Sequence, residues 1–233
     1  MLYYNNFMAL DFGNVIVLLV AVVVGTAAAC GGQPSTPTPD IGATVEAKVG
    51  EQANNVAHNS DLAKDYHNSA VGYFNANEYQ LAIEDFDKAI QLGYGMSYTF
   101  RIRGIAYAML GQYQLAILDY DKAIELDPDY VLAYDNRGGA YAKLEQYQRA
   151  VQDYDKAIQL DPDLADAYSN RGIAYSYQGQ YQRAIQDFDK AILLDPDKVG
   201  AYLGRSYSYN KLGQDAKAEA DFNKGCSLDS RFC

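Results

Sequence analysis

Aromatic and small residues recur at steps of three and four along much of this chain, with polar residues between them. In residues 131–164, a first run with this spacing consists of Tyr134, Gly138 and Tyr141. A second run follows with Ala150, Tyr154, Ala157 and Ile158. Such spacing places the residues of each run on one face of a helix. The pattern therefore predicts two consecutive helices in this stretch.

Glycine and proline predict where these helices end. The two runs are separated by a short polar stretch at residues 145–148, and other parts of the chain place Gly111, Gly179 or Gly213 after the first run. Glycine tolerates the left-handed backbone that closes many helices. The second run stops at Asp-Pro, where proline lacks the amide donor and disfavours helical geometry in the residue before it. These pairs are Asp127-Pro128, Asp161-Pro162 and Asp195-Pro196.

The two-helix pattern returns every 34 residues, five times, without insertion or deletion. The five repeats are residues 63–96, 97–130, 131–164, 165–198 and 199–232. One helix pair is too small to bury its own apolar face, so neighbouring pairs must cover one another. The period therefore predicts an extended array of stacked helix hairpins.

The repeat resembles the tetratricopeptide repeat. That family places an aromatic residue at position 4, a small residue at 8, Tyr at 11, Ala at 20, an aromatic residue at 24, Ala at 27 and Pro at 32. Residues 131–164 fill these positions with Tyr134, Gly138, Tyr141, Ala150, Tyr154, Ala157 and Pro162. The outer repeats depart from the pattern at Tyr94, Ser206 and Gly225. The resemblance implies an all-α, right-handed superhelical solenoid of five helix-turn-helix repeats.

Two sets of recurring residues are interpreted as structural. Glycines at position 8 and alanines at position 20 are expected to let the two helices approach closely. Arginine recurs at position 7, together with aspartates in the second helix, as Arg103, Arg137, Arg171 and Arg205. We favour a bidentate pairing of each arginine with a nearby repeat aspartate. The alternative is a row of cations for an acidic ligand.

A concave groove lined by the first helix of each repeat is where the resemblance places binding. Position 6 carries Asn136 and Asn170 in adjacent repeats, and an asparagine can donate to and accept from a peptide backbone at once. The alternative is that both are only members of the repeat pattern. A basic clamp for a C-terminal carboxylate is not expected, because Asp135 and Asp166 occupy the places of its basic groups. The predicted groove residues are Asn68, Arg101, Ile105, Met109, Asp135, Asn136, Ser169, Asn170, Ile173, Tyr177 and Tyr207.

The N-terminal part differs from the repeats. An apolar run at residues 15–29 is too short for a typical membrane-spanning helix and suits the core of a signal peptide. Residues 27–30, Ala-Ala-Ala-Cys, resemble a bacterial lipobox, which implies lipidation of Cys30 and a Pro/Ser/Thr-rich spacer after it. Residues 1–14 contain no Lys or Arg, which leaves three alternatives: a misassigned start, an uncleaved anchor, and a buried or artefactual segment. The expected organisation is a signal peptide or anchor at 1–29, lipidated Cys and linker at 30–62, and repeats at 63–232.

Charge and cysteine usage narrow the possible partners. The net charge of −11 argues against nucleic acid, whose phosphates would be repelled, and would steer a basic partner favourably. Apart from Cys30, the sequence contains two cysteines, Cys226 and Cys233, and the oxidising environment of an exported protein would allow them to form a disulfide. The alternative is that Cys226 fills an apolar position and Cys233 frays.

The sequence contains no phosphate-binding glycine loop, nucleophile elbow or zinc-spaced Cys/His cluster, so we predict no catalytic residue, cofactor or metal. We expect a non-catalytic scaffold, tethered to a bacterial membrane outside the cytoplasm, that binds a protein or peptide segment in its groove. The alternatives are self-association into a homo-oligomer, and a cytoplasmic co-chaperone-like module on an uncleaved anchor.

Overall fold

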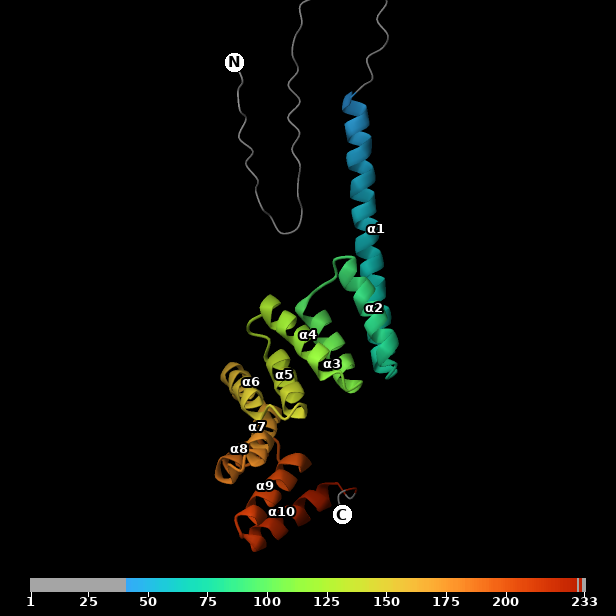
Figure 1. Cartoon of the computed structure of the whole chain (residues 1–233). Helices are drawn as coiled ribbons and strands as arrows, with labels where there is room; N and C mark the ends of the chain where they lie inside the picture. Colours follow the sequence, from blue (N-terminus) through green and yellow to red (C-terminus); the bar gives the residue numbers. More distant parts are fainter. Residues whose placement is uncertain (1–40, 230, 232–233) are drawn as a thin grey trace, which may run out of the picture. The chain divides into compact units, whose positions relative to one another are not determined.

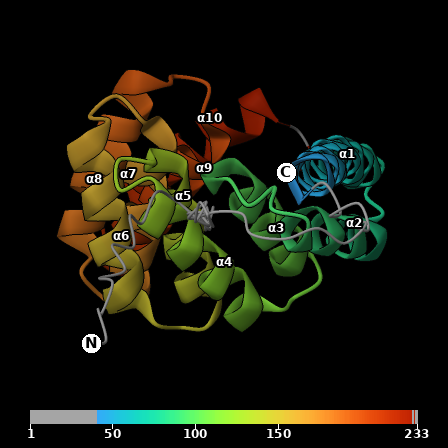
Figure 2. The ribbon, with the colours of Figure 1, turned by 90° about the horizontal axis from the view of Figure 1, so that it is seen from above.

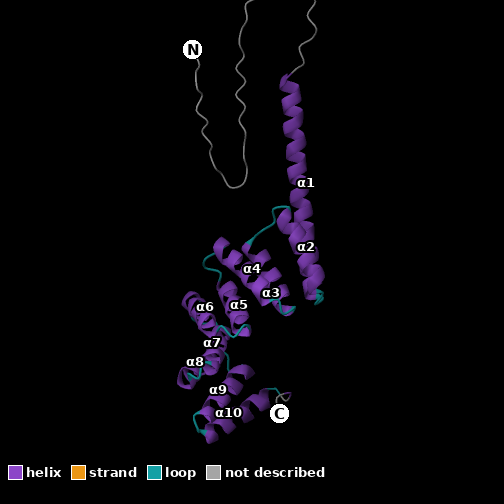
Figure 3. Ribbon diagram, viewed as in Figure 1, coloured by secondary structure: helices purple, strands orange, loops and turns teal. Residues whose placement is uncertain are grey.

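The computed structural model describes residues 41–229 and residue 231, and this part of the chain contains helices and loops but no strand (Figures 1 and 3). The chain divides into two compact units, residues 1–45 and 46–233. Of the first unit the structure describes only residues 41–45, the start of α1; the rest of α1 and all the following helices belong to the second unit. The helices are α1 (Ile41–Asn75), α2 (Tyr79–Gln91), α3 (Ser97–Met109), α4 (Tyr113–Leu126), α5 (Val131–Lys143), α6 (Tyr147–Leu160), α7 (Ala165–Tyr177), α8 (Tyr181–Leu194), α9 (Val199–Lys211) and α10 (Asp215–Leu228).

Helices α3 to α10 form four hairpins with the predicted 34-residue period, and the C-terminal part of α1 packs with α2 as the first hairpin. The repeats stack as the predicted all-helical solenoid. Helix α1 begins at Ile41, before the expected start of the first repeat at residue 63. Residues 41–62, which the sequence analysis placed in the linker, are therefore helical in this structure. Periodicity gave no signal for this extension because it lies outside the repeated pattern.

The helix ends follow the predicted chemistry. Helices α4, α6 and α8 all stop at the leucine before the Asp-Pro pair. After the first helices, Gly111, Gly179 and Gly213 have φ between +70° and +75°. Glu145 takes the same place in the third repeat with φ +59°, although a side chain disfavours this region. The left-handed closure of the hairpin is thus imposed by the fold even where no glycine is present.

Small residues bring the two helices of a hairpin together. A Cβ added to Gly138 would lie 2.7 Å from Cε1 of Tyr154, and one added to Gly104 would lie equally close to Tyr120. The alanines of the second helices are fully buried beside these rings; they include Ala116, Ala150 and Ala184. The predicted close approach is confirmed for the second to fourth repeats, where an aromatic ring packs against a glycine and buried alanines.

The departures of the outer repeats have local compensations. Tyr94 replaces the proline after α2, and its ring lies 4.8 Å from the ring of His67. Ser206 replaces the position-8 glycine and donates a 2.7 Å hydrogen bond to the carbonyl oxygen of Ala218. Gly225 replaces an alanine, and a Cβ there would lie 2.9 Å from Leu203. Each exception therefore fits a neighbour specific to its own end of the array.

The first helices occupy the inner side of the array. In the described part of the chain, α3 contacts α5, α5 contacts α7 and α7 contacts α9, whereas successive second helices do not contact one another. Figure 2 shows α5 and α9 nearer the middle of the view than α6 and α8. Stacked elements touch more closely on the concave side of a curve, so the first helices line it, as expected.

Candidate functional site

A groove of about 740 Å³ opens on the inner side of the second to fourth repeats. Residues of α3, α5 and α7 line it, together with the first residues of α4 and α6. Seven of the predicted groove residues are brought together here, namely Ile105, Met109, Asp135, Asn136, Asn170, Ile173 and Tyr177. The floor includes the rings of Tyr120 and Tyr154, which are almost fully buried.

Exposed apolar side chains gather in this groove. Met109 is 58% exposed and Tyr177 is 69% exposed, and Ile173 is also exposed. Tyr177 stacks on Tyr147, with ring centroids 5.0 Å apart and planes inclined by 4°. Exposed apolar groups gathered in a concave site offer area that a ligand could bury.

Two hydrogen bonds link the helices beneath these side chains. Nη1 of Arg101 donates to Oδ1 of Asn136 at 3.4 Å, and Nδ2 of Asn170 donates to Oδ1 of Asp135 at 3.1 Å. The chemistry of the partners fixes both amide orientations, because a guanidinium only donates and a carboxylate accepts. Asn136 therefore keeps its NH₂ group for a ligand, and Asn170 keeps its carbonyl oxygen.

Four predicted residues lie elsewhere. Arg101 is held by Tyr130, whose hydroxyl oxygen accepts a 2.6 Å hydrogen bond from Nε. Ser169 is only 4% exposed and lies beneath the surface. Asn68 is exposed on α1, and Tyr207 lines a separate pocket near the end of the array. These four residues do not contribute to the groove's lining.

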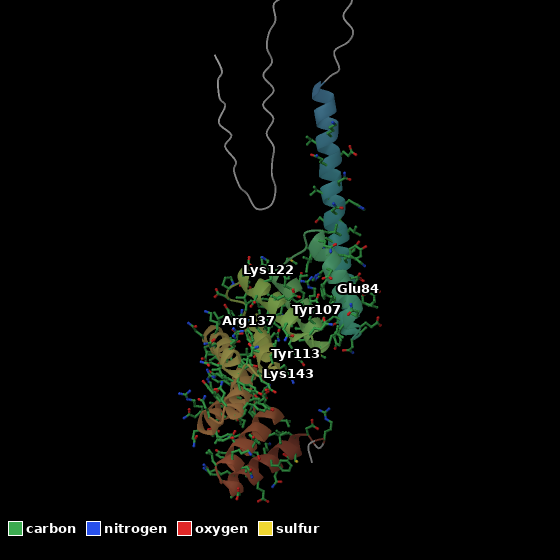
Figure 4. All side chains as sticks on the ribbon, in the orientation of Figure 1. Glu84, Tyr107, Tyr113, Lys122, Arg137 and Lys143 are labelled. Carbon is green, nitrogen blue, oxygen red and sulfur yellow. The ribbon has the colours of Figure 1, made fainter. Side chains whose placement is uncertain are left out.

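Other lining residues come from positions that the sequence analysis did not select. Tyr113 and Tyr147 are the first residues of α4 and α6. Lys143 is the last residue of α5, and Glu145 lies in the loop after it. Figure 4 shows Tyr113 and Lys143 near one another. The expectation concerned first helices alone, whereas the starts of α4 and α6 also reach the groove. The recurring Tyr at position 17 was the available signal.

The recurring arginines are structural, as favoured. Arg137 donates from Nε and Nη2 to Asp153 at 2.8 and 2.6 Å, and from Nη1 to Asp121 of the preceding repeat. The same three bonds recur at Arg103, Arg171 and Arg205. The paired aspartates of α4, α6 and α8 are thereby directed to two different arginines. Among the described residues, no group of His, Cys, Asp or Glu is arranged to hold a metal ion.

The predictions for the N-terminal segment and the disulfide fall outside the described residues, because these do not include Cys30 or Cys233. Within the described chain, no helix has the length and apolar character needed to cross a membrane.

Family models match more than half of the chain. A model described as "Tetratricopeptide repeat" matches residues 165–198, another with this description matches 199–232, and one described as "TPR repeat" matches 104–145 and 138–179. No curated protein sequence matches the chain.

Several solved structures share the fold. MamA (residues 41-end) from Desulfovibrio magneticus RS-1 is 25% identical, with a TM-score of 0.67 over 73% of this chain and 97% of that one. YrrB, described as a TPR protein with an unusual peptide-binding site, is 21% identical, with a TM-score of 0.61 over 76% and 92%. PilF from Pseudomonas aeruginosa is 18% identical, with a TM-score of 0.65 over 73% and 78%.

Proposed function

Because the chain belongs to the tetratricopeptide repeat family, we propose that it is a non-catalytic interaction scaffold that binds an extended protein segment in its groove. The observation that carries this proposal is the combination of exposed Met109 and Tyr177 with the amides of Asn136 and Asn170 in one groove. An extended segment presents alternating side chains and unpaired backbone groups, so it requires both apolar area and hydrogen-bond partners.

The two asparagines match the needs of a peptide backbone. Asn136 offers a donor to a backbone carbonyl, and Asn170 offers an acceptor to a backbone N–H. Each is already held by a side chain of the preceding repeat, which reduces the entropy lost on binding. The likeness to YrrB extends to the fold alone, so the proposal depends on these side chains of the chain itself.

The test is capture of partners from membranes after crosslinking, with the wild-type chain compared with Asn136→Ala/Asn170→Ala. The matched control is Asn55→Ala/Asn75→Ala, which removes two exposed asparagines of α1 outside the groove. We expect the groove variant to lose partners that the wild type and the control both retain, with unchanged helix content and melting temperature. Capture of the same partners by all three chains would overturn the groove proposal.

We also propose that Cys30 carries a lipid that tethers the scaffold to the outer side of a bacterial cytoplasmic membrane or to a further envelope membrane. Support comes from the apolar run and the small residues before Cys30. The test is metabolic labelling with an alkyne fatty acid, together with sequencing of the mature N-terminus. Labelling that persists in Cys30→Ser, or a mature chain that still begins at Met1, would contradict this tether; the latter would favour the uncleaved-anchor alternative.

Self-association is the second candidate, and the end of the array favours it. Phe222 occupies the position of Phe188, yet Phe222 is 44% exposed while Phe188 is fully buried by the following repeat. A pocket of about 650 Å³ lies there, and its lining includes Leu203, Tyr207 and Phe222. Asn223 stands where the other repeats carry the aspartate that receives the next arginine. A further repeat docked at this end would therefore lack that ion pair.

Sedimentation at several concentrations separates the candidates. A mass that rises with concentration and returns to that of one chain in Phe222→Glu would support association through this end. A constant mass of one chain would exclude it and leave the groove scaffold alone.

A further inference from the structure

Asp135 lies in the lining of the groove without a cationic partner. Its carboxylate accepts one hydrogen bond, from the neutral amide of Asn170, and among the described residues it takes part in no ion pair. Asp166, at the start of α7, is held by Lys198, with an Nζ–Oδ1 distance of 2.6 Å. That lysine is therefore engaged by another carboxylate, and the second carboxylate oxygen of Asp135 accepts no hydrogen bond from a described residue.

The position of Asp135 is electrostatically costly. Burial raises the pKa of its carboxyl group, and the hydrogen bond from Asn170 only partly offsets this effect. A half-buried carboxylate that accepts a single neutral hydrogen bond gains strongly from a cation that approaches it. The charged residues that line the groove are Asp135, Lys143 and Glu145. The charges of Lys143 and Glu145 cancel in the sum, so Asp135 makes the net charge of the lining negative.

The buried aspartates of the second helices show which partner a buried carboxylate has elsewhere in this chain. Asp119, Asp153, Asp187 and Asp221 are each paired with an arginine through two hydrogen bonds. Asp135 belongs to a first helix, and among the described residues no arginine donates a hydrogen bond to it. Lys198, whose charge lowers the pKa of Asp135, is held by Asp166. A ligand is thus the remaining source of a guanidinium or ammonium group for this carboxylate.

We propose that the groove selects segments in which a lysine or arginine, placed between apolar residues, pairs with Asp135. This inference rests on the proposed groove function and gives its ligand a chemical class. Met109, Ile173 and Tyr177 line the same groove and bury the apolar neighbours of the basic residue. The chain's net charge of −11 would steer such a segment toward the protein before contact.

The test uses three fluorescent nine-residue peptides with blocked ends, identical except at the centre. Two leucines flank a central lysine, norleucine or glutamate. By fluorescence anisotropy, we expect the lysine peptide to bind the wild-type chain at least tenfold more tightly than the glutamate peptide, and several-fold more tightly than the norleucine peptide. In Asp135→Asn, which retains an oxygen for Asn170, the preference for lysine should fall about tenfold, the ratio that corresponds to 1.4 kcal/mol.

Asp163→Asn is the matched control, because it removes one negative charge from an exposed loop residue outside the groove. It should leave the preference unchanged. Equal binding of all three peptides, a preference for glutamate, or an equal loss in Asp135→Asn and Asp163→Asn would overturn the inference. Failure of all probes to bind, while partner capture still depends on Asn136 and Asn170, would overturn it and leave the groove proposal standing.

Discussion

Arg137 and Asp153 are joined by two parallel hydrogen bonds, from Nε to Oδ2 at 2.8 Å and from Nη2 to Oδ1 at 2.6 Å. They come from the two helices of one repeat, and the third bond of the arginine reaches Asp121 in the second helix of the preceding repeat. One guanidinium therefore fixes both the angle of its own hairpin and the stacking on the previous hairpin. Ser69 replaces this arginine in the first repeat and donates to Asp85 at 2.7 Å.

The two carboxylates on Arg137 should differ in their effect on stability. Asp153 is 6% exposed, whereas the side chain of Asp121 is largely solvated. Asp153→Ala leaves a partly buried guanidinium without its bidentate partner and should lower the free energy of unfolding by about 3 kcal/mol. Asp121→Ala should lower it by about 1 kcal/mol or less. Urea denaturation followed by circular dichroism measures both, and equal losses would contradict this account.

Two adjacent glycines should respond in opposite ways to alanine. A Cβ on Gly138 would lie 2.7 Å from the Tyr154 ring, whereas one on Gly139 would meet only the Tyr154 hydroxyl at 3.9 Å. Gly138→Ala should destabilise the protein by about 1–3 kcal/mol through overpacking. Gly139→Ala should be neutral or stabilise it by up to about 1 kcal/mol, because alanine favours helices. Thermal melts of the two variants make the comparison; a similar loss in both would disprove the close-approach explanation.

The left-handed residue after α5 offers a stabilising substitution. Glu145 has φ +59°, a region that costs a residue with a side chain about 1–2 kcal/mol. Glu145→Gly should therefore raise the free energy of unfolding by about 0.5–1 kcal/mol after the greater flexibility of unfolded glycine is counted. The converse change, Gly179→Ala, should lower it by a similar amount. Urea denaturation midpoints of the two variants measure these changes. A lower stability of Glu145→Gly would show that the Glu145 side chain stabilises the loop.

His67 should make stability depend on pH. It is buried among the rings of Phe86, Tyr94 and Tyr98, with Nδ1 3.3 Å from Oγ1 of Thr99. Burial lowers the pKa of His67 in the folded chain. Below about pH 6.5 the unfolded chain then binds a proton that the folded chain resists, so stability falls as the pH falls.

Unfolding free energies between pH 7.5 and 5.5 test this dependence. The stability contributed by His67 should fall with pH at no more than about 1.4 kcal/mol per pH unit, the limit for one proton. His67→Gln should remove the part of the pH dependence that His67 contributes, because glutamine does not titrate. A pH dependence identical in wild type and His67→Gln would rule out this residue as its source.

The groove shows how far residue types alone define a binding site. The repeat pattern placed Asn136 and Asn170 at equal positions of adjacent repeats, and both line the groove because equal positions in stacked copies lie side by side. It could not show that Arg101 and Asp135 hold these amides, since each contact joins residues one repeat apart. Asp135 and Ser169 occupy the same position in adjacent repeats, and the pattern could not show that Ser169 is buried while Asp135 lines the groove. Side-chain packing between neighbouring repeats determines both.

The sequence by itself determined the two-helix unit, its period, the ends of its helices and the pairing of arginine with aspartate. These features are local or recur identically, so a single periodic pattern carries them. Only the tertiary structure decided which of the paired aspartates serves which repeat, where α1 begins, and which side chains remain open in the groove. These properties depend on contacts between successive hairpins, and the geometry of stacking is set by the summed packing of many side chains.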